Sequence, residues 1–257
     1  IAGKMVVVRS LVAGLKLIPV APSGHPLKDL KEAPTFAAMI PMQVYNTLQV
    51  PEERENLMNI KHLIIGGGAI DDALARELKS FPNHVWSTYG MTETLSHIAL
   101  RRLNGTDASD WYTPFENVSI RLSKEGTLII NAPNVCPEEL ITNDIAEINA
   151  EGKFRILGRK DNTINSGGVK IQIEQVEAAL KAHLDIPFQI TARKDAKFGE
   201  IVVLIYNKVK DEATVRQICE ETLPPYWVPK AYIAVEELPM TGTGKPDRAT
   251  ARRLASL

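Results

Sequence analysis

Short apolar runs between turn residues constrain the fold of this chain more than any other feature. Three such runs, FAAMI, HLIIGG and HVWSTYG, fall within residues 36–90, and DDALARELKS between the last two is typical of a helix. Runs of this length suit buried strands of a mostly parallel sheet, which is covered on both faces. Residues 1–95 are therefore predicted to form an α/β subdomain, with a first helix at about 2–16 and a strand at LIPVA.

The pattern changes twice further along the chain. Within residues 96–160, strands such as HIALRR, VSIRL and GTLIINAP alternate with Gly, Asn, Pro and Asp, which predicts a small barrel-like β subdomain. Residues 161–257 mix strands with helices, and the polar segment GRKDN before them suits an interdomain hinge. The predicted fold class is thus α/β plus α+β, with a large domain at 1–160 and a small mobile domain at 161–257.

Composition excludes several classes of function. The 257 residues carry a net charge of -1, which gives no electrostatic case for binding nucleic acid or an anionic membrane. Cys136 and Cys219 are too few and too distant for a disulfide or zinc framework, which favours a reducing, cytoplasmic compartment. No apolar stretch reaches the roughly 20 residues of a membrane span.

The first residues also predict an incomplete amino terminus. Lys4, Arg9 and Lys16 run through the first apolar stretch, whereas a secretory signal keeps its charges ahead of that stretch. There is no initiator Met, and the chain starts inside a predicted helix. We therefore expect an upstream segment to be absent.

Two motifs follow predicted strands in the first half of the chain. The glycines of GGGA, residues 66–69, would let the backbone approach a ligand closely, although a simple strand-to-helix turn explains them equally well. In STYGMTETLSH, Tyr89 offers a ring to a base, Thr92 a hydroxyl to a phosphate oxygen, and Glu93 a carboxylate to magnesium. Strand ends are where α/β sheets bind ligands, but the same residues could cap a helix.

Two further motifs lie in the second half. Asp144 could accept hydrogen bonds from ribose hydroxyls, and Arg159 could donate to the sugar or to phosphate. Gly167 and Gly168 permit a tight turn. Lys245 follows Gly-Thr-Gly, so its ammonium could reach developing negative charge from a loop, although a lone loop lysine is usually just solvated.

In this order, the four strings resemble the adenylate-forming superfamily of acyl-CoA synthetases, luciferases and adenylation domains, over essentially the whole chain. The resemblance implies a ligase that uses ATP and Mg²⁺ to form an acyl-adenylate, and then coenzyme A to form a thioester. It also implies nucleotide-binding roles for Gly67, Gly68, Ala69, Ser87, Tyr89, Gly90, Asp144 and Arg159.

The remaining family roles concern catalysis and domain motion. The resemblance places Thr92 at the α-phosphate and Glu93 at the magnesium ion. It matches Lys245 to the lysine that stabilises adenylate formation, and Asp161 to the hinge about which the small domain rotates. Gly168 matches the glycine beside the pantetheine tunnel.

Within the superfamily, YGMTET before a serine, INSGG and PMQVYNTL look like the ligases that act on o-succinylbenzoate in menaquinone biosynthesis. That likeness implies a substrate-carboxylate role for Arg9 and substrate contacts for Met91 and Ser96, although Arg9 could equally lie on a solvated helix face. Thr142-Asn143-Asp144 replaces the usual Thr-Gly-Asp but keeps the aspartate.

Three alternatives remain open. The Ser/Thr/Gly-rich loop that holds the β- and γ-phosphates is missing from this chain, so the chain alone is expected to be inactive. It could instead be a non-catalytic adenosine-binding fragment, or part of another aryl or fatty acyl-CoA ligase. A Rossmann oxidoreductase is disfavoured because the G-x-G-x-x-G fingerprint is absent. The expected partners are a small carboxylic acid, ATP and CoA, with a homo-oligomer possible.

Overall fold

The computed structural model describes residues 2–68, 70, 72–241 and 245–257. The chain divides into two compact units, one formed by the residues up to Thr142 with Glu147–Arg155, the other by Asn143–Ala146 with Ile156–Leu257. The described part of the chain has no helix with the length and apolar character needed to cross a bilayer. The mixture of sheets and helices confirms the predicted fold class, while the predicted domain boundaries stay predictions.

The first sheet joins parallel and antiparallel strands. Its five strands pair in chain order: β1 (Phe36–Met39), β2 (His62–Ile65), β3 (His84–Gly90), β4 (His97–Arg102) and β5 (Thr113–Pro114). The first three are parallel, as predicted, and β4 and β5 are antiparallel additions. HIALRR was expected in the separate β subdomain, but it pairs with β3 because only a short loop separates the two strands.

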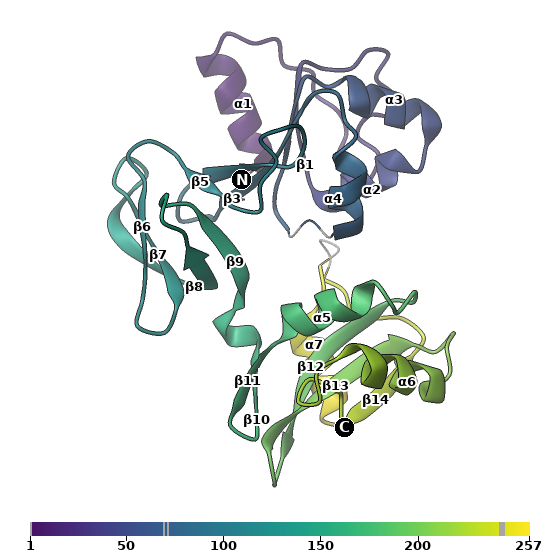
Figure 1. Ribbon diagram of the computed structural model, residues 1–257. Helices are drawn as coiled ribbons and strands as arrows, with labels where there is room; N and C mark the ends of the chain where they lie inside the picture. The colour runs from purple at the N-terminus through teal and green to yellow at the C-terminus, as the bar shows by residue number, and fades with distance from the viewer. Residues whose placement is uncertain (1, 69, 71, 242–244) are drawn as a thin grey trace. The chain divides into compact units, whose positions relative to one another are not determined.

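Three helices cover the apolar side chains of this sheet. They are α2 (Pro41–Leu48), α3 (Pro51–Asn59) and α4 (Asp72–Leu78), which Figure 1 shows grouped apart from α1. Pro41 and Pro51 each stand in the first turn of their helix, where the missing N–H costs nothing. Leu57 and Leu78 pack with Leu63 and Ile65 of β2, which fixes the strand ends from which the site is built.

The first helix is shorter than predicted. α1 spans Ala2–Val12 rather than about 2–16, because Gly14 adopts a φ of +63° and ends it. The Leu15 N–H donates to the Ser10 carbonyl at 2.8 Å, which closes the turn. The predicted strand LIPVA was wrong: residues 17–21 form no strand in the structure, and Pro19 has no N–H to give to a ladder.

A second, four-stranded sheet follows. It pairs β6 (Ser119–Leu122), β7 (Thr127–Ala132), β8 (Cys136–Ile148) and β9 (Phe154–Arg159) in that order. The predicted strands VSIRL and GTLIINAP are confirmed as β6 and β7, whereas β8, with 13 residues, is longer than the short strands expected here. The division between the two units passes through β8 and β9, so these strands carry residues of both.

The second unit is an α+β domain around a third sheet. Its elements are the short helix η1 (Lys160–Asn162), β10 (Thr163–Ser166), β11 (Val169–Gln172), α5 (Ile173–Lys181), β12 (Phe188–Asp195), β13 (Gly199–Asn207), α6 (Glu212–Thr222), β14 (Ala231–Val235) and α7 (Arg248–Ala255). Gly167 and Gly168 form the two-residue turn between β10 and β11, with φ values of +58° and +86° that glycine adopts without strain.

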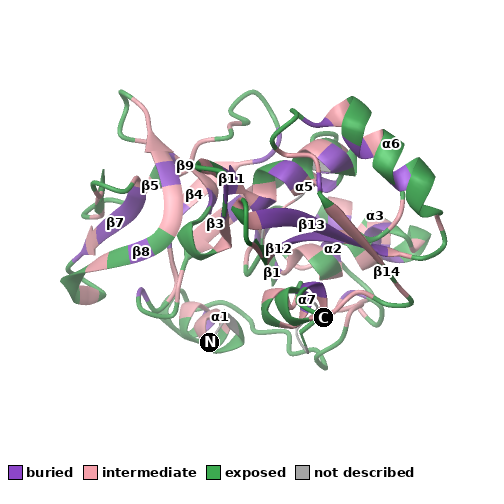
Figure 2. Cartoon of the chain, turned by 90° about the horizontal axis from the view of Figure 1, so that it is seen from below, coloured by how far each residue is buried: buried purple, intermediate pink, exposed green. Residues whose placement is uncertain are grey.

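The central strand of this unit is buried on both faces. Val202 and Leu204 belong to the core beneath α5 and α6, while Ile201 and Val203 pack with Ala255 of α7. Figure 2 shows β13 buried along most of its length. In α6, Val215 and Cys219 are fully buried, whereas Ile218 and Thr222 are only half-buried.

Candidate active site

In the glycine loop after β2, Gly66 approaches Thr88 too closely for a side chain. The Gly66 N–H donates to the Met39 carbonyl at 3.0 Å, and a Cβ on Gly66 would lie 2.2 Å from Thr88 Oγ1. Gly67 has a φ of +78°, which also favours glycine. Gly67 and Gly68 are exposed, so their backbone can meet a ligand. Ala69, predicted to bind the same ligand, lies outside the described residues.

An aromatic cluster fixes the end of β3. The Tyr89 ring packs edge-on against Phe154, with centroids 5.0 Å apart, and lies 5.8 Å from the Tyr112 ring. Ser87 is buried, and its hydroxyl is hydrogen-bonded to Tyr112 Oη at 2.7 Å. The half-buried Tyr89 ring is thus held in place, while Ser87 is engaged within the protein; their predicted nucleotide contacts stay predictions.

The loop at residues 91–96 is held by a buried threonine. Thr94 Oγ1 accepts the Met91 N–H at 3.0 Å and donates to the Ser96 carbonyl at 2.7 Å. A Cβ on Gly90 would lie 2.3 Å from that carbonyl oxygen, so the loop can close only over glycine. The side chains of Thr92 and Glu93 are left exposed, as a role toward phosphate and metal requires.

Three side chains converge at the start of β4, and we call them the Arg9 cluster: Arg9, Ser96 and His97. Arg9, in the last turn of α1, donates from Nη2 to Ser96 Oγ at 2.5 Å. The same nitrogen lies 3.3 Å from His97 Nδ1, and Ser96 Oγ lies 3.3 Å from that Nδ1. The structure therefore brings together two of the three residues predicted to contact the substrate, Arg9 and Ser96. The third, Met91, is half-buried in the loop before Ser96.

The Arg9 cluster keeps one positive charge. Burial lowers the pKa of the Arg9 guanidinium from its ordinary value, yet an arginine stays protonated at neutral pH. Burial and the charge of Arg9 lower the pKa of His97 to about 4, so this imidazole is neutral at pH 7. Within the described residues, no carboxylate forms an ion pair with Arg9, so the cluster can attract an anion.

A second arginine, in the other unit, lies between two carboxylates, and we call Asp144, Arg159 and Asp161 the Arg159 cluster. Arg159 Nη1 donates to Asp144 Oδ1 at 3.1 Å, and Nε and Nη2 each donate to one Asp161 oxygen at 3.0 Å. These bonds lower the pKa of Asp161 and, with Asp161 as the main cause, raise the pKa of Arg159. Predicted ribose and hinge residues thus share one network.

The predicted hinge is packed closely beside this cluster. Asn162 Nδ2 donates to Glu174 Oε1 at 2.6 Å. A Cβ on Gly158 would lie 2.8 Å from both Gln172 Oε1 and Glu174 Oε2. A side chain at residue 158 would therefore require the ends of the Gln172 and Glu174 side chains to shift.

Lys245 is hydrogen-bonded to Thr241 through two contacts. The Thr241 N–H donates to the Lys245 carbonyl at 2.7 Å, and the Lys245 N–H donates to Thr241 Oγ1 at 3.1 Å. The Gly-Thr-Gly segment between them lies outside the described residues. The Lys245 side chain is exposed, so its ammonium is available for a charge from elsewhere.

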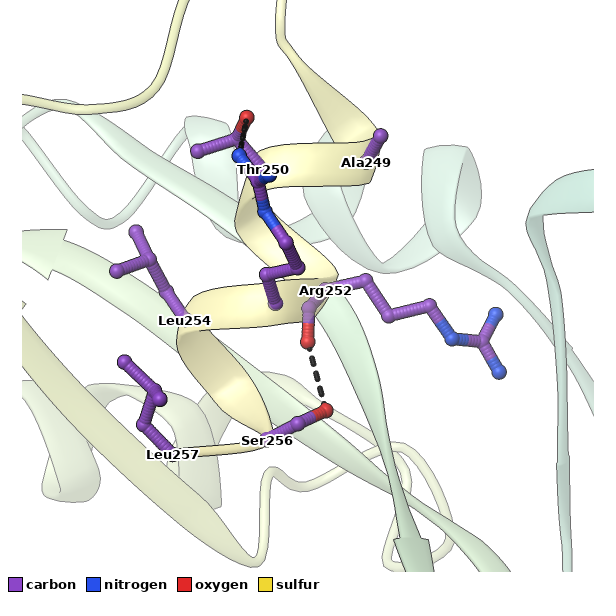
Figure 3. Close-up of a pocket in the computed structure, with 7 residues that line it drawn as sticks. Ala249, Thr250, Arg252, Leu254, Ser256 and Leu257 are labelled. Carbon is purple, nitrogen blue, oxygen red and sulfur yellow. Dashed lines mark hydrogen bonds between the residues drawn. The ribbon is translucent and has the colours of Figure 1, made fainter.

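The hollows of the second unit contribute little to this site. One of about 620 Å³ lies along α7 and is lined by that helix and the residues after it, including Arg252, Leu254 and Leu257 (Figure 3). None of its lining residues is a predicted site residue. Another, of about 240 Å³, is lined by Asp161 together with Arg248 and Arg252, but Arg248 is already paired with Glu177 at 2.6 Å.

The cysteines take no part in the site. Both are free thiols, as their spacing predicted. Burial raises the pKa of the Cys219 thiol to about 11, so it is not a nucleophile at neutral pH.

Sequence reasoning missed three residues at these positions. Tyr112 and Phe154 support Tyr89 from distant segments, and His97 contacts Arg9 across 88 positions of the chain. His97 directly follows the predicted Ser96, which was the only available signal. No sequence pattern near Tyr112 or Phe154 indicates that these residues support Tyr89.

Comparison with known proteins gives the family. The model of the AMP-binding enzyme family matches residues 1–135, and that of the AMP-binding enzyme C-terminal domain matches residues 175–245. The chain therefore belongs to the AMP-binding enzyme family. It is 26% identical over 215 residues to a 2-succinylbenzoate–CoA ligase from Listeria innocua, which covers 74% of this chain and 45% of that protein. The chain thus spans about half the length of the curated relatives it matches.

Solved structures agree with this assignment. An acyl-CoA synthetase (AMP-forming)/AMP-acid ligase II-like protein from Dyadobacter fermentans is 31% identical, with a TM-score of 0.54 over 90% of this chain and 68% of that one. The o-succinylbenzoate CoA synthetase from Bacillus subtilis, bound to an acyl-adenylate, gives a TM-score of 0.77 at 21% identity, over 97% of this chain and 58% of that one. At that identity the second likeness shows the fold alone.

Proposed function

We propose that this chain is part of an ATP-dependent acid–CoA ligase that acts on a dicarboxylic acid of the o-succinylbenzoate class. The observation that carries the proposal is the Arg9 cluster, a half-buried cation held against a hydroxyl and a neutral imidazole. A carboxylate distant from the reacting one would supply the missing negative charge. The relatives named as 2-succinylbenzoate–CoA ligases support this substrate class.

The reaction would proceed by two displacements. An oxygen of the reacting carboxylate attacks the α-phosphorus of ATP, and pyrophosphate leaves. The CoA sulfur then attacks the acyl carbon, the C–O bond to AMP breaks, and the thiol proton is lost. Splitting the reaction in this way replaces one difficult step by two easier ones.

The chain's own residues would bind and orient the nucleotide. The fixed ring of Tyr89 and the exposed backbone of Gly67 and Gly68 suit an adenine. Asp144 and Arg159 suit the ribose, and Thr92 suits the α-phosphate. Gly168 lies in an open turn, where a Cβ would meet no atom within 4 Å, and this suits a passing pantetheine chain.

The available residues fit a magnesium ion bound together with the nucleotide. Magnesium is commonly held by one or two carboxylates plus substrate phosphates and water. Glu93 offers one exposed carboxylate, and no group of three metal-ligating residues occurs within the described ranges. Such an ion would neutralise phosphate charge, while Lys245 would stabilise the charge that develops as pyrophosphate leaves.

Replacing Arg9 tests the proposal. In the protein that contains this chain, Arg9→Ala should raise the KM for o-succinylbenzoate at least about 30-fold, because losing a charge-assisted bond to a buried partner costs about 2–5 kcal/mol. The KM for ATP should stay unchanged, as should turnover of a monocarboxylic analogue. Arg121→Ala is the control, since that exposed arginine of β6 forms an ion pair with Glu139 of β8.

Two results would count against the proposal. An unchanged KM for the dicarboxylic acid would mean that Arg9 does not bind the substrate and is only a solvated residue of α1. Faster conversion of monocarboxylic aryl or fatty acids by the unaltered protein would place it among the other acyl-CoA ligases.

A further inference from the structure

His97 is the member of the Arg9 cluster to which the proposed function gives no role. It opens β4, where its backbone lies opposite Gly90 of β3. Its ring packs against Phe115 with centroids 5.4 Å apart and an interplanar angle of 63°. The imidazole is therefore held between Phe115 on one side and the Arg9 guanidinium on another.

The contacts of Arg9 within the cluster use a single nitrogen. Nη2 donates to Ser96 Oγ and approaches His97 Nδ1, so Nη1 and Nε are engaged by neither residue. A guanidinium is planar and carries its five N–H donors in a fixed arrangement. Two acceptors on Nη2 therefore set the direction in which Nη1 and Nε point.

The donor and acceptor roles follow from chemistry. Arginine only donates, so the Nδ1 that faces it must be the acceptor, and the proton of the neutral ring belongs on Nε2. Arg9 is the charged group that contacts His97 within the described residues, and its charge opposes protonation of the ring. Protonation of the ring would place a hydrogen on Nδ1 and so remove the bond that Nδ1 accepts from Arg9.

The two acceptors differ in stiffness. A serine hydroxyl rotates about its C–O bond and can follow a moving partner. The imidazole is a rigid ring already packed against Phe115. Of the two, His97 is thus the group that can fix the guanidinium plane.

We propose that His97 is a positioning residue that orients Arg9 so that its Nη1 and Nε face the distal carboxylate of a dicarboxylic substrate. This inference rests on the proposed function. His97 itself touches no substrate atom in this proposal. It acts on specificity, because a monocarboxylic acid has no group for the oriented donors.

The test measures both substrates in the protein that contains this chain. His97→Ala should raise the KM for o-succinylbenzoate about tenfold, the size of one hydrogen bond to a charged group. The kcat should stay within about twofold, and the KM values for ATP and for a monocarboxylic analogue should not change. His97→Asn should restore most of the lost affinity, because its Oδ1 can accept in place of Nδ1. His84→Ala, at an exposed histidine on β3, is the control.

Several results would overturn the inference. A parallel rise in KM for both acids, or a fall in kcat, would show that His97 only supports the fold. If Arg9→Ala raises the KM and His97→Ala does not, this inference alone fails; if neither does, the proposed function fails. If His97→Ala does not fold, two other measurements decide. The inference is overturned if His97→Asn raises the KM as far as Arg9→Ala does. It is also overturned if ¹H–¹⁵N correlation spectra of the unaltered protein show the Nδ1–H tautomer of His97.

Discussion

The two arginine clusters differ in the charge of their partners. Arg159 is shared between two carboxylates, Asp144 and Asp161, and its pKa is raised above the ordinary value. Arg9 is bound to a hydroxyl and a neutral ring, and its pKa is lowered by burial. Asp144 and Asp161 compensate the charge of Arg159, whereas no carboxylate in the part of the chain that the structure describes forms an ion pair with Arg9.

This difference teaches what each cluster can recognise. An arginine already neutralised by carboxylates gains little from another anion. The remaining acceptor oxygens of those carboxylates suit neutral hydroxyls such as those of ribose. An uncompensated, half-buried cation has already lost part of its hydration and gains most from an anion. Lys245 resembles Arg9 in having no ion-pair partner among the described residues, but its side chain is exposed and keeps its hydration.

The largest expected effect concerns Lys245. If uncompensated cations act on reacting charge, Lys245→Ala should slow ATP–pyrophosphate exchange roughly 100- to 1000-fold, because removing one preorganised donor costs about 2.7–4 kcal/mol. Conversion of supplied acyl-adenylate to thioester should stay near normal. Lys208→Ala is the control, since that lysine already pairs with Glu236. Equal losses in both half-reactions would show that Lys245 does not act specifically on the charge that develops during adenylate formation.

Replacing Arg159 should weaken nucleotide binding and leave the KM for the carboxylic acid unchanged, the reverse of the effect expected for Arg9. Arg159→Gln removes the donor shared by Asp144 and Asp161, and we expect AMP affinity to fall about tenfold, the scale of a bond to a charged group. The KM for the carboxylic acid should not change. Calorimetric titration with AMP and acid kinetics measure the two effects, with Arg155→Gln, which pairs with Glu147, as control. A comparable rise in the acid's KM would break the distinction between the clusters.

Local patterns predicted the elements that depend on near neighbours. The parallel strands β1 to β3 follow from the apolar runs, and the Gly167-Gly168 turn follows from the conformations that glycine adopts. LIPVA failed because an apolar run becomes a strand only with a partner ladder, which local composition does not reveal.

The site could be predicted only in part for the same reason. Arg9 and Ser96 were each assigned to the substrate through a family resemblance, and no local pattern brings together residues 87 positions apart. The contact of His97 with Arg9 and the support of Tyr89 by Phe154 depend on how distant segments pack. Such contacts are set by tertiary structure, so single residues could be proposed from the sequence but their partners could not.

The smallest expected effect is on stability, and it tests whether the Arg9 cluster truly excludes a second charge. The pKa of His97 is lowered to about 4 from 6.5, so between these pH values the unfolded chain binds more protons than the folded one. The contribution of His97 is therefore fully present above pH 6.5 and is lost as the pH falls toward 4.

Because the ring is partly exposed, solvent screening should reduce the effect to about 1 kcal/mol. Denaturant unfolding of the unaltered protein and of His97→Asn, at pH 7 and pH 4.5, measures it, since other carboxylates affect both proteins alike. On going from pH 7 to pH 4.5, the unaltered protein should lose about 1 kcal/mol more unfolding free energy than His97→Asn. An unchanged difference would mean that His97 titrates normally beside Arg9, and the two arginine clusters would then differ less in charge than their contacts indicate.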